Sequence, residues 1–368
     1  MTNVMRVGDG RKRRVTSVIH LEQLREAGRT PAEDRQIEAE KVVKVLAKLL
    51  HIMVGDITED KTNTVIVAGV VAVLAMMHGQ AESAMHQEAS CIALRNLIVE
   101  DAENTTKAVD AGAIEAMLEA MRGHSESAAV QEAACRGLQT LTCNSAESRT
   151  RAGSAGAIEA VLAAMRGHPG SAAVQEAACN ALCDLTYNSA ESTIKAVDTG
   201  AIEALLAAMR GHPGSAAVRE AACLALGNLT YDSAENCIKA GSAGAIEAVL
   251  AAMRRHPGSA AVQEVACNAL CDLTCNIAKI RIKAVNVGAI KDVVAAMRGH
   301  AGSPLIVEEG CRALHVLIGD TAEYKLRAQN AGAKELAKAA VQAHSGNRKA
   351  VDMARAHLKQ MKAKKAVH

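Results

Sequence analysis

Residues 189–232 read SAESTIKAVDTGAIEALLAAMRGHPGSAAVREAACLALGNLTYD. The middle of this stretch carries an apolar stripe that consists of Ile202, Leu205, Leu206 and Met209. Intervals of three and four residues place such a stripe on one face of a helix. Glycines at 200 and 211 bracket the stripe, and glycine commonly follows the last residue of a helix. The stretch therefore predicts three helices, at about 190–199, 201–210 and 216–231.

The ends of these helices are marked by residues that can cap them. Ser189 and Ser215 stand directly before the first and third helix, where a side-chain hydroxyl can accept a hydrogen bond from the helix N-terminus. His212 opens the turn between the second and third helix. Ile194 and Val197 are expected to form the apolar face of the first helix. Neighbouring units must bury these faces, because one unit of this size cannot bury them alone.

The same pattern recurs every 44 residues along the chain. The phrase Gly-Ala-Ile-Glu-Ala begins at residues 112, 156, 200 and 244, and partial copies begin at 288 and 332. Such a period predicts a stack of repeated helical units. We expect seven three-helix units, at about 57–100, 101–144, 145–188, 189–232, 233–276, 277–320 and 321–364. The first is eroded and one residue short, and a lone cap helix over about 38–54 precedes it. This divides the chain into a basic amino-terminal tail (1–36), a repeat solenoid (37–364) and a short carboxyl-terminal tail (365–368).

Composition narrows the class of protein further. Hydrophobic residues make up 49% of the chain, yet it contains no Phe, no Trp and only three Tyr. Ligand pockets of enzymes are usually lined by aromatic side chains, so an enzyme is not expected. The net charge of +2 combines an acidic body with basic ends. Nucleic-acid binding along the body is not expected either, because it needs clustered Lys and Arg.

Three features of the sequence bear on where in the cell the protein is found. No run of 18 or more apolar residues occurs, so we expect no membrane span. The amino terminus lacks the apolar stretch of a secretory signal. Eleven cysteines in such a chain indicate reduced thiols. We expect a cytoplasmic protein, with nuclear or organellar import left open.

The segments EAACNALCDLTYNSAESTIKAVDTGAIEALLAAM (176–209) and EAACLALGNLTYDSAENCIKAGSAGAIEAVLAAM (220–253) resemble armadillo repeats. The Ala-rich start of the third helix, the Leu-x-Asn-Leu segment and the following Gly-Ala-Ile all match. The resemblance covers about 57–364 and implies an all-α, right-handed superhelical solenoid. It also implies a concave groove, lined by third helices, in which a ladder of Asn side chains holds an extended partner peptide.

The ladder is only partly present here. Its positions hold Asn96, Thr140, Asp184, Asn228, Asp272 and Val316. Armadillo proteins of the importin-alpha type also carry Trp one turn earlier. Those positions hold Ile92, Arg136, Asn180, Leu224, Asn268 and Arg312, so stacking of Lys stems on Trp is not expected.

The candidate groove is polar and mildly acidic at its centre, with arginines toward its ends. Its residues are Arg95, Asn96, Arg136, Thr140, Asn180, Asp184, Tyr187, Asn228, Tyr231, Asn268, Asp272 and Arg312. This pattern favours a basic or neutral extended segment as the occupant, although any helix in water also has a polar side. The main hypothesis is therefore a non-enzymatic scaffold or adaptor that binds a protein partner.

Two alternatives use other parts of the chain. One is a structural subunit of a large assembly, which contacts its neighbours by the convex face and the ends. The other is a transport or signalling regulator with a basic tail. The tail cluster Arg11, Lys12, Arg13 and Arg14 would be a targeting signal, an intramolecular ligand of the acidic body or a solvated segment.

Histidines and cysteines recur at the spacing of the units, and both residue types can bind metals, but their spacing does not support a metal site. Helices pack roughly 8–10 Å apart, whereas zinc ligands lie about 2 Å from the ion, so the repeated histidines cannot share one metal. We expect them to be turn residues, and most cysteines to be buried. Cys183 and Cys271, next to the ladder, are expected to be exposed and reactive. No nucleotide-binding or catalytic motif occurs, and we expect no metal and no cofactor.

Overall fold

The computed structural model describes residues 59–98 and 102–362. Of the described residues, 59–65 belong to one compact unit and those from 66 onward belong to a second. Within the described residues of both units every regular element is a helix. The expected cap helix over 38–54, the basic tail and the last residues of the chain lie outside the described residues.

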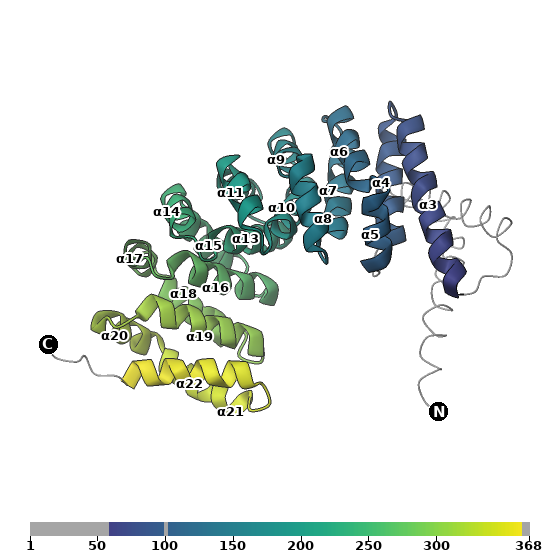
Figure 1. The fold of residues 1–368 in the computed structure, drawn as a ribbon. Helices are drawn as coiled ribbons and strands as arrows, with labels where there is room; N and C mark the ends of the chain where they lie inside the picture. The colour runs from purple at the N-terminus through teal and green to yellow at the C-terminus, as the bar shows by residue number, and fades with distance from the viewer. Residues whose placement is uncertain (1–58, 99–101, 363–368) are drawn as a thin grey trace, which may run out of the picture. The chain divides into compact units, whose positions relative to one another are not determined.

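The helices from residue 102 onward follow one another in triplets (Figure 1). First helices are α5 (Ala102–Asp110), α8 (Ala146–Ala155), α11 (Ala190–Asp198), α14 (Ala234–Ala243), α17 (Ala278–Asn286) and α20 (Ala322–Ala331). Second helices are α6 (Ala113–Gly123), α9 (Ala157–Gly167), α12 (Ala201–Gly211), α15 (Ala245–Arg255), α18 (Ala289–Gly299) and α21 (Ala333–Ala343). Third helices are α7 (Ala128–Thr142), α10 (Ala172–Thr186), α13 (Ala216–Thr230), α16 (Ala260–Thr274), α19 (Pro304–Ile318) and α22 (Arg348–Lys362).

The first described unit differs from the expected triplet. It contains only α3 (Glu59–Gly79) and α4 (Ala84–Ile98). The helix α3 continues through Gly69, which is not among the glycines with positive φ. This copy is one residue short at the position where the other units end the first helix and begin the second, so the two helices continue into each other. The prediction of three helices for 57–100 is therefore wrong for the described part of this unit.

The corner between first and second helices depends on a glycine in the left-handed region. Gly200 has φ 92° and ψ 32°, and its N–H donates to the carbonyl of Val197. A side chain in this conformation costs about 1–2 kcal/mol, which explains why glycine recurs at this position. The predicted serine caps are also present, since Ser189 accepts from the N–H of Ser192 and Ser215 from that of Val218.

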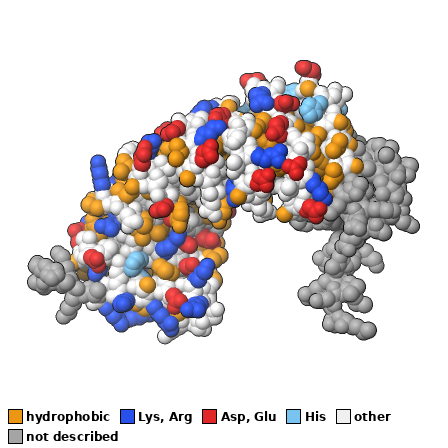
Figure 2. Space-filling model, viewed as in Figure 1, with side chains coloured by type: hydrophobic (Ala, Val, Ile, Leu, Met, Phe, Trp, Pro, Cys, Tyr) orange, Lys and Arg blue, Asp and Glu red, His pale blue; other side chains and the backbone are white. Residues whose placement is uncertain are grey.

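Apolar faces are buried between successive units. The third helices α4, α7, α10, α13, α16, α19 and α22 each pack on the next in the row. The predicted stripe of α12 is fully inside, with Ile202, Leu205, Leu206 and Met209 all at most 1% exposed. Figure 2 shows acidic and basic side chains interspersed with hydrophobic ones on the visible face of the described repeats. None of the described helices is both long and apolar enough to cross a lipid bilayer.

First helices are buried less than the sequence pattern predicts. Val197 is buried, but Ile194 is 60% exposed, so the expected apolar face of α11 is wrong at that position. The same position is exposed in the next three units, at Ile238, Ile282 and Leu326. A helix of only nine or ten residues covers little of its neighbour, so part of its apolar side remains on the surface.

The repeated histidines occupy the turns after second helices and connect neighbouring units. His212 follows α12, and its Nε2 lies 2.8 Å from the carbonyl of Pro169 in the preceding turn. Because a carbonyl only accepts, Nε2 must donate. Five further histidines make the same contact with the turn 43 residues earlier, namely His124, His168, His256, His300 and His344.

Candidate functional site

The third helices α7, α10, α13, α16 and α19 each present a stripe of three half-buried residues at i, i+4 and i+8. In α10 the stripe is Glu176, Asn180 and Asp184, and in α16 it is Glu264, Asn268 and Asp272. Four-residue spacing places the three side chains on one side of a helix. Since third helices pack side by side, the stripes align into three rows across the units. We call these rows the third-helix face.

The three rows differ in how regular they are. The first row is Glu88, Glu132, Glu176, Glu220, Glu264 and Glu308. The second is Ile92, Arg136, Asn180, Leu224, Asn268 and Arg312, and the third is Asn96, Thr140, Asp184, Asn228, Asp272 and Val316. Sequence reasoning identified the second and third rows and missed the first. The missed signal is the Glu that precedes the repeated Ala-Ala-Cys segments at 44-residue spacing.

At its amino-terminal end the first row, which we call the Glu row, is neutralised by arginine. Arg136 donates from Nε to Glu132 at 3.0 Å and from Nη2 to Glu176 at 3.4 Å. Arg95 lies on the neighbouring helix and donates to Asn96. Burial, followed by repulsion from Arg136, lowers the pKa of Arg95. These cations crowd one another around Glu132.

The centre of the Glu row has no such compensation. Within the described residues no ion pair involves Glu220, Glu264 or Glu308. Partial burial raises the pKa of Glu264, and the neighbouring carboxylates of Glu220 and Glu308 raise it further. Three successive units therefore place like charges close enough to repel each other, and an external cation would relieve that repulsion.

Arg312 belongs to a polar cluster at the carboxyl-terminal end of the face. Its Nη2 donates to Oδ1 of Asn268 and lies 2.7 Å from Oε2 of Glu309. Burial raises the pKa of Asp272 to about 6, against the opposing charge of Arg312. Asp272 thus gains its charge within the physiological range of pH.

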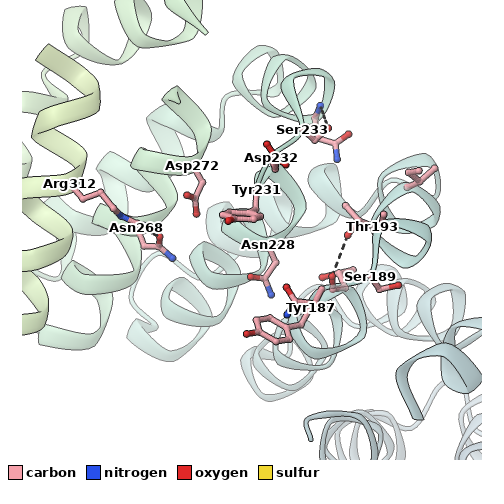
Figure 3. A pocket seen from close by; sticks show the side chains of 15 residues that line it. Tyr187, Ser189, Thr193, Asn228, Tyr231, Asp232, Ser233, Asn268, Asp272 and Arg312 are labelled. Carbon is pink, nitrogen blue, oxygen red and sulfur yellow. Dashed lines mark hydrogen bonds between the residues drawn. The ribbon is translucent and has the colours of Figure 1, made fainter. Parts of the chain in front are cut away.

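A pocket of about 740 Å³ lies beside this cluster (Figure 3). It is lined from the ends of α10 and α13, the beginnings of α11 and α14, and the adjoining stripes of α16 and α19. Six predicted site residues line it, namely Tyr187, Asn228, Tyr231, Asn268, Asp272 and Arg312. Of the other six, Asn96, Arg136, Thr140, Asn180 and Asp184 lie elsewhere on the third-helix face, and Arg95 lies beside Asn96 on α4. Half of the predicted residues therefore meet in one pocket, and most of the rest belong to the same face.

Two details differ from expectation. Cys183 and Cys271 are buried, at 7% and 5% exposure, and burial raises the pKa of each to about 12, so the expectation of exposed, reactive thiols was wrong. The exposed cysteines of the described residues are Cys143 and Cys275.

In addition, Asn228 already donates its amide to the carbonyl of Cys183 at 3.0 Å, which leaves only part of the amide for a partner.

Within residues 59–98 and 102–362 no group of three His, Cys, Asp or Glu side chains is arranged to hold a metal ion. The arrangement instead offers an extended polar face with uncompensated negative charge at its centre.

Comparison with known proteins identifies the class of this solenoid. An engineered protein of known structure is 19% identical, with a TM-score of 0.71, over 93% of this chain and 77% of its own. A designed armadillo repeat protein is 19% identical, with a TM-score of 0.58, over 67% and 98%. Another, solved in complex with the peptide (KR)4, is 21% identical, with a TM-score of 0.56, over 67% and 98%. The protein is an armadillo-type repeat solenoid.

The family is defined by a second comparison. A family model described as LRRK2 ARM repeat matches residues 51–212 and 183–367, which together cover most of the chain. The chain therefore belongs to the LRRK2 ARM repeat family. No curated protein matches it by sequence.

Proposed function

We propose that this protein is a non-enzymatic scaffold or adaptor that holds an extended, basic segment of a protein partner along its third-helix face. The observation that carries the proposal is the Glu row, which repeats one carboxylate per unit while the second and third rows vary. A glutamate that recurs in six successive units suits a ligand that is itself repetitive or extended.

Geometry supports a basic residue at every second or third position of the segment. Packed helices lie roughly 8–10 Å apart. An extended chain rises about 3.3 Å per residue, so two or three residues span one unit. A Lys or Arg at that interval would meet successive carboxylates of the Glu row. The complex of a designed armadillo repeat protein with the peptide (KR)4 shows that this fold can accept such a ligand.

Charge reversal on the face tests the proposal. Affinity capture from the native source, read by mass spectrometry, would compare the wild type with Glu220→Lys/Glu264→Lys and with Asp184→Lys/Asp272→Lys. We expect the basic partner to be lost from both variants. The matched control is Glu191→Lys/Glu203→Lys, which makes the same change in charge on the exposed first and second helices of one unit. Retention of every partner by both face variants would contradict the proposal.

A second candidate function is a structural subunit of a large assembly. The exposed aliphatic row Ile194, Ile238, Ile282 and Leu326 favours it, because first helices offer a regular apolar surface outside the third-helix face. In that case stoichiometric partners would persist in the face variants and be lost from Ile238→Glu/Ile282→Glu.

A regulatory use of the basic tail is compatible with either function. A cytoplasmic location is supported by the eleven free cysteines.

A further inference from the structure

One position of the repeat explains why the pocket exists. The position lies in the first helix of each unit from α5 onward, and its residues are Thr105, Arg149, Thr193, Cys237, Arg281 and Lys325. Three units thus carry a cation at this position, and the other three carry a short side chain. The pocket lies where Thr193 replaces the cation.

Arg149 shows what the cation does in a unit that has one. Its Nη1 donates to the carbonyl of Thr142 at 3.0 Å, at the carboxyl-terminal end of α7. Its guanidinium also lies over the ring of Tyr187, 5.6 Å from the ring centroid. Arg281 repeats part of this arrangement, because its guanidinium lies against Gly319, which is placed relative to Arg281 as Tyr187 is to Arg149.

At the pocket the same place is left open. Thr193 donates to the carbonyl of Thr186 at 3.3 Å, but it is too short to reach the ring of Tyr231, the counterpart of Tyr187 one unit later. Tyr231 is 67% exposed. Of the cation–π contacts in the described residues, at Tyr187 and Tyr324, neither involves Tyr231. In Figure 3, Tyr187 and Tyr231 both border the space.

The surroundings of this space favour a cation. Asp232 and Asp272 contribute carboxylates to the lining, and Asn228 contributes an amide. Arg312, the arginine of the lining, is already bonded to Asn268 and Glu309.

We propose that this pocket binds an arginine side chain of the partner segment, with its guanidinium over the ring of Tyr231 as that of Arg149 lies over Tyr187. The inference rests on the proposed function and names the residue that anchors the segment. Arginine fits better than lysine because its planar group stacks on an aromatic ring while it donates to several acceptors.

The substitution Thr193→Arg introduces the residue that Arg149 and Arg281 provide at the same position of other units. Its guanidinium should fill the pocket from within the chain. Fluorescence anisotropy would measure binding of labelled (Lys-Arg)4, of octalysine and of (Lys-citrulline)4, in which citrulline is the neutral isostere of arginine. We expect wild type to bind (Lys-Arg)4 about 10-fold more tightly than octalysine, and (Lys-citrulline)4 most weakly. Thr193→Arg and Tyr231→Ala should abolish the preference for (Lys-Arg)4 over octalysine, whereas Tyr231→Phe should keep it.

The control Thr106→Arg adds the same charge on the exposed surface of α5 and should also keep the preference. Two results would overturn the arginine proposal: equal affinity of wild type for (Lys-Arg)4 and octalysine, or an unchanged preference in Thr193→Arg. The proposed function would survive either result if Glu220→Lys/Glu264→Lys still weakens the binding of both peptides. If wild type binds none of the peptides and the face variants retain all partners, both this proposal and the proposed function fail.

Discussion

His357 in α22 links the stability of the last unit to pH. Its side chain is 0% exposed, and neither ring nitrogen has a hydrogen-bond partner. Burial, with a smaller contribution from the charge of His315, lowers its pKa from 6.5 to about 4. The folded state therefore holds His357 neutral, whereas the unfolded helix takes up a proton as pH falls below 6.5.

The expected size of the effect follows from that shift. Between pH 4 and 6.5 the unfolded state binds more protons than the folded state, so stability is lost as pH falls. A shift from 6.5 to 4 implies that acidification from pH 8 to pH 4.5 costs about 2.5 kcal/mol through this side chain. Replacing His357 by Leu removes the titrating group and both unpaired nitrogens, so the variant should lose this pH dependence.

Hydrogen exchange of the α22 amides, corrected for intrinsic rates, gives the free energy of opening this terminal helix in both proteins. We expect the wild-type value to fall toward acid pH and to approach a constant offset from His357→Leu above pH 7. The amides of α12, far from His357, are the internal control. Parallel pH dependence of α22 in wild type and variant would refute the reasoning.

Three further outcomes follow from features of the fold and the face. Gly200→Ala should destabilise the protein by about 1 kcal/mol or more in urea unfolding, because φ is 92°, whereas Gly214→Ala, which meets open space, should be nearly neutral. Binding of (Lys-Arg)4 should strengthen as pH rises through 6, where Asp272 gains its charge, and Asp272→Asn should flatten the pH dependence of the dissociation constant. His212→Ala should cost about 1 kcal/mol in urea unfolding through its lost bond to Pro169, and an unchanged midpoint would contradict that role.

Local signals in the sequence were sufficient for most of the fold. Gly200, the serine caps and the stripe from Ile202 to Met209 act within one unit, so their consequences can be predicted from spacing alone. Ile194 failed because its burial depends on how far one short helix overlaps the next, and spacing within a helix does not contain that information. The same limit applies to Cys183, which lies next to a polar row but points into the packed interface.

The candidate site was predicted in part for a related reason. The polar rows could be located from the armadillo resemblance, but the Glu row is not among the ladder positions that the resemblance implies. The pocket depends on a comparison between units, because a short Thr193 matters only relative to Arg149 and to a tyrosine 38 residues further along. Such a feature becomes visible once the neighbouring helices are placed in space.

The contact between each repeated histidine and the preceding turn also bears on how the length of this array can change. In the six units between residues 102 and 362 the donor and the acceptor recur with the same separation, so the histidine of each turn donates to a carbonyl of the preceding turn. Removing or duplicating one whole 44-residue module between two others therefore brings together turns that offer the same donor and the same acceptor. As far as this bond is concerned, the array can lengthen or shorten by whole modules.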